Sequence, residues 1–190
     1  MPKLYFRYGT MGASKSANLI MTATNYQSIG RKVGIIKPST DTRTSDTVSS
    51  RTGMSISVDV LVDEIDDIPV NLEWNAILVD ECQFLQPFQI DQLREISKKI
   101  PVLCYGLRTD YTSHVFPGSL RLLELADSIE EIKMLCACCD SKAVFNAMYK
   151  TNLDGSFTVN RTGSSSPVIG GEELFKALCW NCYDNYSKTT

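Results

Sequence analysis

Short apolar runs alternate with helical patterns over the first two thirds of the chain. Four runs have strand length: Leu4–Tyr8, Val33–Ile36 (which Pro38 ends), Ala76–Val79 and Val102–Leu107. Helical spacing of apolar residues predicts helices over Lys15–Gly30, Pro87–Lys99 and Ser119–Ala126, and a further strand is predicted over Ile129–Leu135. Strands separated by helices need crossover connections, so the pattern predicts an α/β fold with a mostly parallel sheet.

Polar residues gather where these predicted strands end. Gly9, Asp80 and Arg108 each follow a strand, and ligands of open parallel sheets bind beyond the carboxyl ends of the strands. The pattern therefore places the chemistry on one edge of the sheet. The stretch Asp41–Gly53 is rich in Ser, Thr and Arg and is predicted to be a functional or mobile loop.

The character of the chain changes after Cys136. Two short strands, Val144–Tyr149 and Phe157–Val159, are separated by a turn signal at 153–155, and a flexible stretch follows over Arg161–Pro167. Short strands flanked by C-x-x-C pairs are typical of a zinc-ribbon-like module. We therefore expect two domains: a P-loop NTPase-like α/β domain over 1–135, and a small zinc-binding β module over 136–190.

A phosphate-binding loop is predicted between the first strand and the first helix, the context that the motif requires. Backbone N–H groups at the helix start would hold phosphate oxygens, Lys15 would supply a charge and the Ser16 hydroxyl would reach Mg²⁺. Ser14 stands where glycine is usual, which would reshape the loop. The alternative is a chance Gly/Ser-rich turn. The loop comprises Gly9, Thr10, Met11, Gly12, Ala13, Ser14, Lys15 and Ser16.

A second polar pair, Asp80 and Glu81, ends the apolar strand at Ala76–Val79. Asp80 is in a position to hold Mg²⁺, and Glu81 is in a position to accept a proton from an attacking hydroxyl or water. The alternative is two solvated residues at a strand end.

Cys136, Cys139, Cys179 and Cys182 form two C-x-x-C pairs, which together complete a closed Cys₄ site typical of structural zinc. Cys138 offers another second ligand, but C-x-x-C has the commoner geometry, so Cys139 is chosen. The alternative is a set of buried free thiols.

Composition narrows the class of protein. The chain has 190 residues, 43% hydrophobic and 22% charged, with a formal charge of −3 and a pI near 5.2. This balance argues against a surface for nucleic acid. No apolar run approaches the roughly 18 to 20 residues that span a bilayer. No signal peptide is expected from the N-terminal sequence, so we expect a cytoplasmic protein with its thiols reduced.

With these motifs in place, the chain resembles the type II thymidine kinases of bacteria, their phages and animals. Val79–Phe84 is similar to the family's V/I-D-E-x-Q-F segment, and Cys104–Tyr111 to its C/A-Y-G-L-R-T-D-F run. The remaining matches, in the family order, are Asp41–Arg43, Ser50–Gly53, Val168–Gly171 and both cysteine pairs.

The resemblance implies ATP-dependent transfer of a phosphoryl group to the 5′-hydroxyl of thymidine, with Glu81 as the general base. It implies that Lys15, Ser16, Asp80 and Gln83 serve ATP and Mg²⁺, and that Arg43 lies near the transferring phosphate or the 5′ end of the nucleoside. It also implies dTTP as a feedback inhibitor and a homotetramer or homodimer. The nucleoside pocket implied by the resemblance comprises Met11, Leu107, Tyr111, Phe116, Phe175 and a lasso-like loop over 163–171 that includes Val168, Ile169, Gly170 and Gly171.

Two positions depart from the family pattern. Ser14 replaces the glycine before the lysine, and Phe175 stands where tyrosine is usual. We expect a change in affinity from each, with the reaction retained. Two other functions stay open at this point. One is a zinc-ribbon module that binds nucleic acid or protein and carries a degenerate phosphate loop, and the other is a plain ATPase in which Glu81 activates water.

Overall fold

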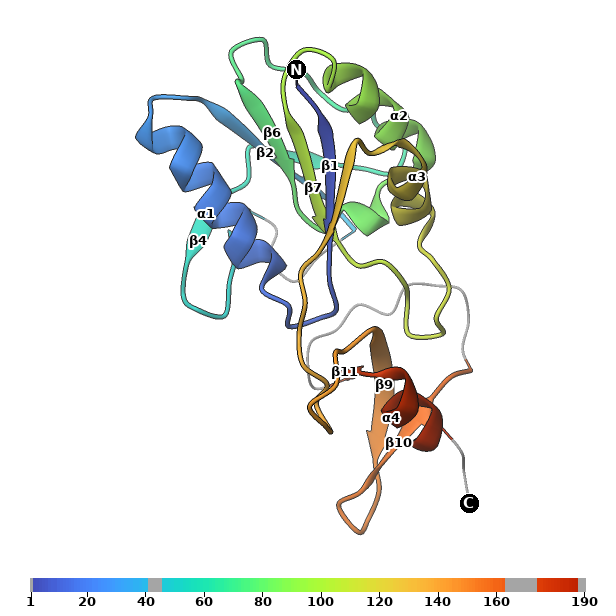
Figure 1. Ribbon diagram of the computed structural model, residues 1–190. Helices are drawn as coiled ribbons and strands as arrows, with labels where there is room; N and C mark the ends of the chain where they lie inside the picture. Colours follow the sequence, from blue (N-terminus) through green and yellow to red (C-terminus); the bar gives the residue numbers. More distant parts are fainter. Residues whose placement is uncertain (1, 41–45, 163–173, 188–190) are drawn as a thin grey trace.

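The computed structural model describes residues 2–40, 46–162 and 174–187. Its main body is a six-stranded sheet with the order β5-β2-β6-β7-β1-β8, in which every pairing is parallel (Figure 1). The predicted α/β fold is therefore confirmed. The strands are β1 (Leu4–Tyr8), β2 (Val33–Pro38), β5 (Val60–Val62), β6 (Ala76–Val79), β7 (Val102–Gly106) and β8 (Ser128–Glu131).

Helices cover both faces of this sheet. One face packs against α1 (Lys15–Ser28) through Leu19, Ile20 and Ala23, which contact apolar side chains of β2, β6 and β7. The other face packs against α2 (Pro87–Ile96) and α3 (Pro117–Leu125), where Leu93 and Leu122 are fully buried. Because β6 and β7 are covered on both sides, they consist of buried residues throughout, as their continuous apolar sequence predicts.

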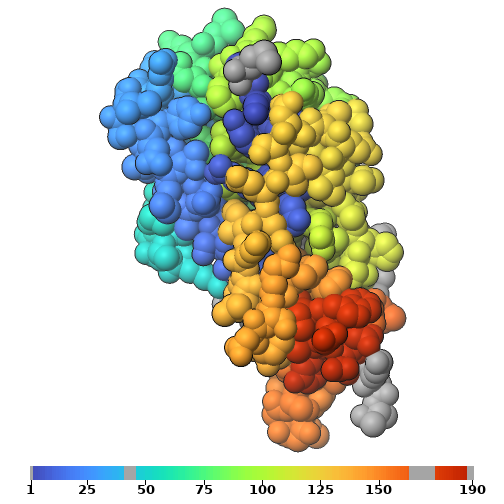
Figure 2. Space-filling view, viewed as in Figure 1, coloured from blue at the N-terminus to red at the C-terminus, as the bar shows by residue number. Residues whose placement is uncertain are grey.

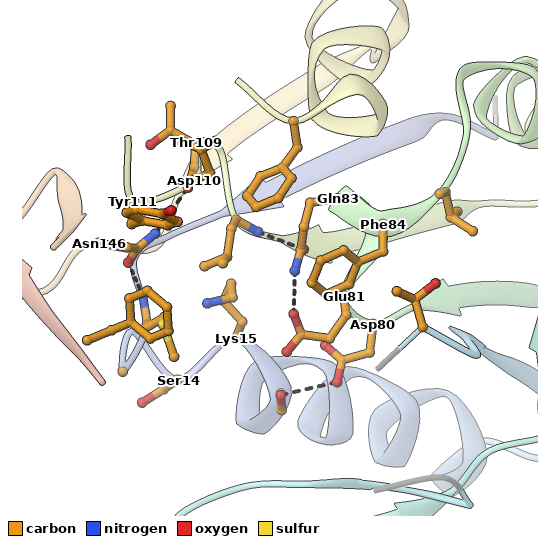
Figure 3. A pocket seen from close by; sticks show the side chains of 18 of the residues that line it. Ser14, Lys15, Asp80, Glu81, Gln83, Phe84, Thr109, Asp110, Tyr111 and Asn146 are labelled. Atoms are coloured by element: carbon orange, nitrogen blue, oxygen red, sulfur yellow. Dashed lines mark hydrogen bonds between the residues drawn. The ribbon is translucent and has the colours of Figure 1, made fainter. Parts of the chain in front are cut away.

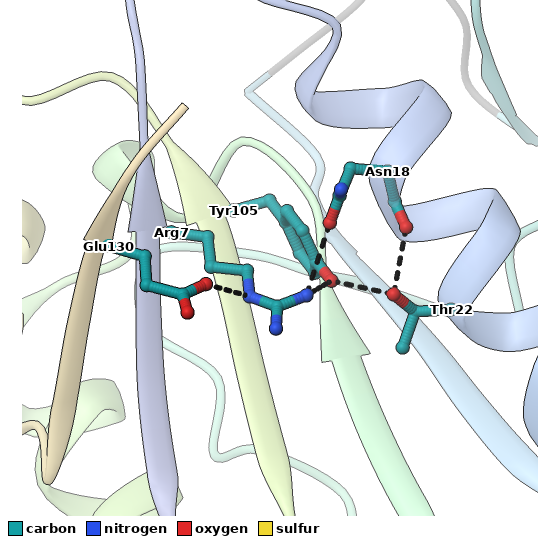
Figure 4. A network of polar contacts seen from close by, with 5 residues as sticks. All are labelled: Arg7, Asn18, Thr22, Tyr105 and Glu130. Carbon is teal, nitrogen blue, oxygen red and sulfur yellow. Dashed lines mark hydrogen bonds and ion pairs between the residues drawn. The ribbon is translucent and has the colours of Figure 1, made fainter. Parts of the chain in front are cut away.

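A polar network fastens α1 to the sheet beneath it (Figure 4). Arg7 of β1 donates from Nη1 to Asn18 Oδ1 and to the Tyr105 hydroxyl, both at 3.1 Å. The Tyr105 hydroxyl also lies 3.1 Å from Thr22 Oγ1. On the other side, Arg7 Nε lies 2.8 Å from Glu130 Oε2, an ion pair without hydrogen-bond geometry at Nε. The helix that starts at the phosphate loop is thus held by β1, β7 and β8 together.

The chain beyond β8 forms a smaller sheet with the order β10-β9-β11, all antiparallel. Its core includes Ala147, Leu178 and Tyr183, each fully buried. This C-terminal module projects from one end of the main body (Figures 1 and 2). A domain boundary at residue 135 stays a prediction. The elements of the module are β9 (Phe145–Thr151), β10 (Phe157–Asn160), β11 (Phe175–Leu178) and α4 (Trp180–Asn185).

Some predicted bounds were wrong. The helix predicted to reach Lys99 ends at Ile96, since Pro101 excludes helical geometry at the residue before it and the chain turns earlier. The strand predicted over 129–135 is β8, which stops at Glu131 because only that far does it have β1 as a partner. The predicted polar loop, Asp41–Gly53, contains the short strand β3 (Thr47–Ser49). This strand pairs antiparallel with β4 (Ser55–Ser57), which begins just after the predicted loop. The sequence pattern also missed β5, β11 and α4.

Candidate active site

The carboxyl ends of β1, β6 and β7 open onto one cavity of about 630 Å³. Of the strand-end residues named from the sequence, Asp80 lines this cavity, whereas Gly9 and Arg108 lie outside its lining. Residues from the phosphate loop line one end, and aromatic side chains from the segment after β7 line the other (Figure 3). Of the predicted site residues, those in its lining are Met11, Gly12, Ser14, Lys15, Ser16, Asp80, Glu81, Gln83, Leu107, Tyr111, Phe116 and Phe175.

The phosphate loop joins β1 to the N-terminus of α1, where helix N–H groups and the helix dipole favour an anion. Lys15 is buried, and its Nζ donates to the Thr10 carbonyl at 2.9 Å. Gly12 has φ +86°, a conformation that is strained for any residue with a Cβ atom, and a Cβ there would also displace the Met134 side chain, whose Sδ would lie 2.8 Å away. Gly9, Thr10 and Ala13 shape the loop from outside the cavity lining. Within the loop, the Ala13 N–H donates to the Thr10 carbonyl at 3.1 Å, so the turn before α1 is closed by its own backbone.

Ser14 is the N-cap of α1, with φ 60° and ψ 31°, a left-handed conformation. This is the conformation in which glycine carries no penalty and an L side chain is strained. Serine in place of the usual glycine therefore adds backbone strain at this position, while the left-handed turn itself is kept. The Ser14 side chain is exposed and makes no capping hydrogen bond.

The carboxylate of Asp80 lies beside Ser16, whose hydroxyl donates to Asp80 Oδ2 at 3.2 Å. Asp80 is 4% exposed, and its Oδ1 is buried with no hydrogen-bond partner among the described residues. Burial first, and then the Glu81 carboxylate, raise the pKa of Asp80 to about 7, while Lys15 opposes the shift. A buried, orphaned carboxylate oxygen next to a serine hydroxyl suits a hard divalent cation, which would restore the charged form.

Glu81 has φ 49°, a second left-handed non-glycine residue, at the start of a short 3-10 helix, η1 (Cys82–Phe84). Its Oε2 accepts a hydrogen bond of 2.5 Å from Gln83 Nε2. Gln83 is almost fully buried, and its Oε1 accepts from the Leu107 N–H at 2.9 Å. Gln83 thus orients Glu81 and ties β6 to the segment after β7 (Figure 3). Backbone strain of this kind is concentrated at functional sites.

The apolar end of the cavity is built by side chains that are far apart in the sequence. The rings of Tyr111 and Phe175 lie 6.3 Å apart, and the Phe116 ring meets Phe84 edge-on at 5.8 Å. These rings give this end of the cavity an apolar lining, as is usual where a small molecule binds. Val168, Ile169, Gly170, Gly171 and Arg43 lie outside the described residues.

Sequence reasoning missed Asn146, which is buried and also lines the cavity. It stands on β9, and its side chain bonds to the phosphate loop and to the segment after β7. No motif marks it, because asparagine in a predicted strand carries no chemical signal of its own. Phe84, Asp110 and His114 also line the cavity without having been predicted as binding residues.

Four cysteines of the C-terminal module are placed to hold a metal ion. The Sγ atoms of Cys136, Cys139, Cys179 and Cys182 all lie within 4.8 Å of one another. Cys139 Sγ is 3.6 Å from Cys179 Sγ and 3.7 Å from Cys182 Sγ. Four sulfurs about 2.3 Å from a common zinc ion would be roughly 3.8 Å apart. The choice of Cys139 is supported, and Cys138 is not part of this cluster among the described residues.

Hydrogen bonds from Ser141 favour the thiolate form of Cys139. The backbone N–H of Ser141, and then its hydroxyl, lower the pKa of the Cys139 thiol to about 6. A thiolate is the form that binds a metal. Cys82 and Cys104 are fully buried in the core of the main body, where they pack as small apolar residues.

A parallel sheet with a phosphate loop after β1 and a carboxylate pair after β6 defines the class of P-loop α/β nucleotide-binding proteins. Within that class, the chain belongs to the thymidine kinase family, whose sequence model matches residues 2–183. The predicted family and the prediction of an enzyme are confirmed.

Relatives of this family match along nearly the whole chain. Thymidine kinase from Chromobacterium violaceum is 37% identical over 187 residues, covering 96% of this chain and 98% of the relative. Thymidine kinase from Enterobacteria phage T4 is 37% identical, with 95% and 96% covered. Thymidine kinase from Streptococcus agalactiae is 34% identical, with 97% and 98% covered.

Proposed function

We propose that this chain transfers the terminal phosphoryl group of ATP to the 5′-hydroxyl of thymidine, giving dTMP. Membership of the thymidine kinase family supports the substrate, and it favours an enzyme over the binding-module alternative. One observation carries the mechanism: Glu81 lines the same cavity as the phosphate loop and the aromatic wall formed by Tyr111 and Phe175 (Figure 3).

The phosphate end of the cavity would bind ATP. N–H groups at the start of α1 and the Lys15 ammonium would hold the phosphate oxygens, and they would stabilise the charge that develops during transfer. The Ser16 hydroxyl and the Asp80 carboxylate would hold Mg²⁺, which neutralises phosphate charge when bound. The orphaned Asp80 Oδ1 fits this role.

The nucleoside end would orient the 5′-hydroxyl toward the phosphates. The thymine ring would lie against Tyr111 and Phe175, with Met11, Leu107 and Phe116 completing an apolar wall. Glu81 would accept the hydroxyl proton, and its carboxylate is held in place by the Gln83 amide. Arg43 and the lasso-like loop over 163–171 belong to this proposal through the family resemblance alone.

The C-terminal module also belongs to the proposed function. The module is proposed to hold one structural Zn²⁺ on its four cysteines, a set closed to substrate. We further propose dTTP as a feedback inhibitor, a homotetramer or homodimer, and a cytoplasmic location. Within the described residues, no helix has both the length and the apolar character needed to cross a bilayer.

The test is to incubate the purified protein with ATP, Mg²⁺ and a panel of nucleosides, and to identify the products. We expect dTMP, and a loss of about 10²-fold or more in kcat for Glu81→Gln, as is usual when a general base is removed. Glu95→Gln, on the exposed face of α2, is the matched control. Phosphate release that is indifferent to added nucleoside would instead indicate the ATPase alternative. Equal kcat values for Glu81→Gln and the parent would refute the role of Glu81.

A further inference from the structure

The C-terminal module contacts the segment that lines the nucleoside end of the cavity through the side chain of Tyr183. Tyr183 lies in α4, directly after Cys182, and is fully buried. Its hydroxyl donates to the Tyr111 carbonyl at 2.8 Å and lies 3.0 Å from Ser113 Oγ, which donates to it. These two bonds join α4 to a segment about 70 positions earlier in the chain.

The Tyr183 ring is held firmly by its own module. It stacks on Phe145 of β9, with ring centroids 4.7 Å apart and an interplanar angle of 15°. The Arg161 guanidinium lies 4.8 Å from the ring centroid, a cation–π contact. The neighbouring cysteines at 179 and 182 tie α4 to the metal-binding cluster. The direction of the hydroxyl is therefore set by the module as a whole.

The segment that receives this hydroxyl contains a residue in a strained backbone conformation. Ser113 has φ 73°, a left-handed conformation that costs an L residue free energy unless contacts compensate. The Tyr111 carbonyl has a buried partner in Tyr183. Turn contacts from Asp110, which accepts from the N–H groups of Thr112 and His114, complete the loop. Loss of the phenol hydroxyl would leave the Tyr111 carbonyl unpaired, which favours a rearranged loop.

Tyr111 is the link from this contact to the cavity. Its side chain lines the cavity beside Phe175, whereas Tyr183 is not among the described residues that line it. Tyr183 would therefore act on a bound nucleoside only through the loop it holds.

We propose that Tyr183 is a positioning residue, through which the cysteine-bearing module sets the place of Tyr111 in the nucleoside wall. The proposal rests on the function proposed above. The C-terminal module would then hold the loop between β7 and α3 in place, in addition to folding itself. The Tyr183 hydroxyl makes both of the hydrogen bonds involved, donating one to the Tyr111 carbonyl and accepting one from Ser113 Oγ.

The test uses the full-length protein and the variant Tyr183→Phe, which keeps the stacked ring and removes only the hydroxyl. Tyr186→Phe is the matched control, since Tyr186 lies one turn away and its hydroxyl has no hydrogen bond among the described residues. The measurements are KM for thymidine, KM for ATP, kcat, metal content, and amide hydrogen exchange of peptides covering 107–118 and 174–187.

We expect Tyr183→Phe to raise KM for thymidine about tenfold, equivalent to about 1.4 kcal/mol. KM for ATP should stay within about twofold of the parent. Exchange should rise over 107–118, with metal content and exchange over 174–187 unchanged. Tyr186→Phe should match the parent in every measurement.

Two results would overturn the proposal while leaving the proposed function intact. One is an active parent whose Tyr183→Phe variant has an unaltered KM for thymidine. The other is loss of metal together with faster exchange over 174–187, which would indicate a role confined to folding of the module. A parent protein that phosphorylates no nucleoside would refute the proposed function itself, and the role of Tyr183 in nucleoside binding would fall with it.

Discussion

The backbone N–H of Met11 donates a hydrogen bond of 2.7 Å to Oδ1 of Asn146, a residue 135 positions further along the chain. The Asn146 Nδ2 group donates in turn to the Thr109 carbonyl at 3.3 Å. One buried amide on β9 therefore connects the phosphate loop, the segment after β7 and the C-terminal module (Figure 3). Asn146, which itself lines the cavity, therefore links the phosphate loop to the segment that carries Tyr111.

Replacing Asn146 by alanine should weaken both fold and binding. The Met11 N–H and the Thr109 carbonyl would lose their partner, and an unpaired buried group costs about 1–3 kcal/mol. We expect a loss of that size in the free energy of unfolding by urea, with KM raised for both ATP and nucleoside. Asn185→Ala, at the exposed end of α4, is the control. Parent-like stability and KM values in Asn146→Ala would contradict this role.

Replacing Ser14 by glycine should stabilise the protein. The left-handed conformation costs an L residue roughly 1–2 kcal/mol, and part of the gain is offset because glycine loses more backbone entropy on folding. We expect the free energy of unfolding to rise by about 0.5–1 kcal/mol in chemical denaturation. Ser14→Ala keeps the Cβ atom and therefore the strain, so it should show no such gain. Equal stability of the two variants would show that strain at Ser14 is negligible.

The metal cluster can be tested with a pair of adjacent cysteines. Cys139→Ser removes one of the four clustered sulfurs, so we expect zinc to fall from about one per chain toward zero and the C-terminal module to unfold at a lower temperature. Cys138→Ser is the control, because Cys138 is outside the cluster, and it should keep the metal. Metal analysis and thermal unfolding measure both effects. Equal zinc loss from the two variants would refute the choice of ligand.

The carboxylate of Asp127 should make stability depend on pH. Its ion pair with Arg94, and then the hydrogen bond of 2.8 Å from the Leu4 N–H, hold the pKa of Asp127 below its usual value. A lowered pKa means that the stabilisation is present above the unfolded pKa, near 3.9, and is lost as pH falls through the folded pKa.

Asp127→Asn should therefore be less stable than the parent at pH 7, by less than about 1 kcal/mol because the pair is partly exposed. The difference should shrink below about pH 4, as the parent's carboxyl becomes protonated. Urea midpoints at pH 7 and at pH 3 to 4 measure it. A difference that is constant across this range would show that the charge of Asp127 contributes nothing.

Local patterns in the sequence were enough to predict the class of fold and to place the candidate site at the carboxyl ends of the strands. Apolar runs such as Ala76–Val79 are continuous because both faces of the sheet are covered, and that regularity is visible without coordinates. The motifs at Lys15 and Glu81 are contiguous, so their spacing alone indicates their chemistry. The short strand Val60–Val62 was missed because three residues carry too little periodicity.

Tertiary structure decided everything that depends on residues distant in the chain. The orphaned oxygen of Asp80 and the bonds made by Asn146 and Tyr183 arise only when strands and modules pack together. The physical reason is the distance along the chain over which each kind of interaction acts. Hydrophobic periodicity and motif spacing act over a few residues, whereas a buried hydrogen bond is satisfied by whichever group the fold brings near. The sequence by itself determined a phosphate loop, a carboxylate pair and a cysteine cluster. The fold decided which side chains connect the elements that carry them, as Asn146 and Tyr183 do.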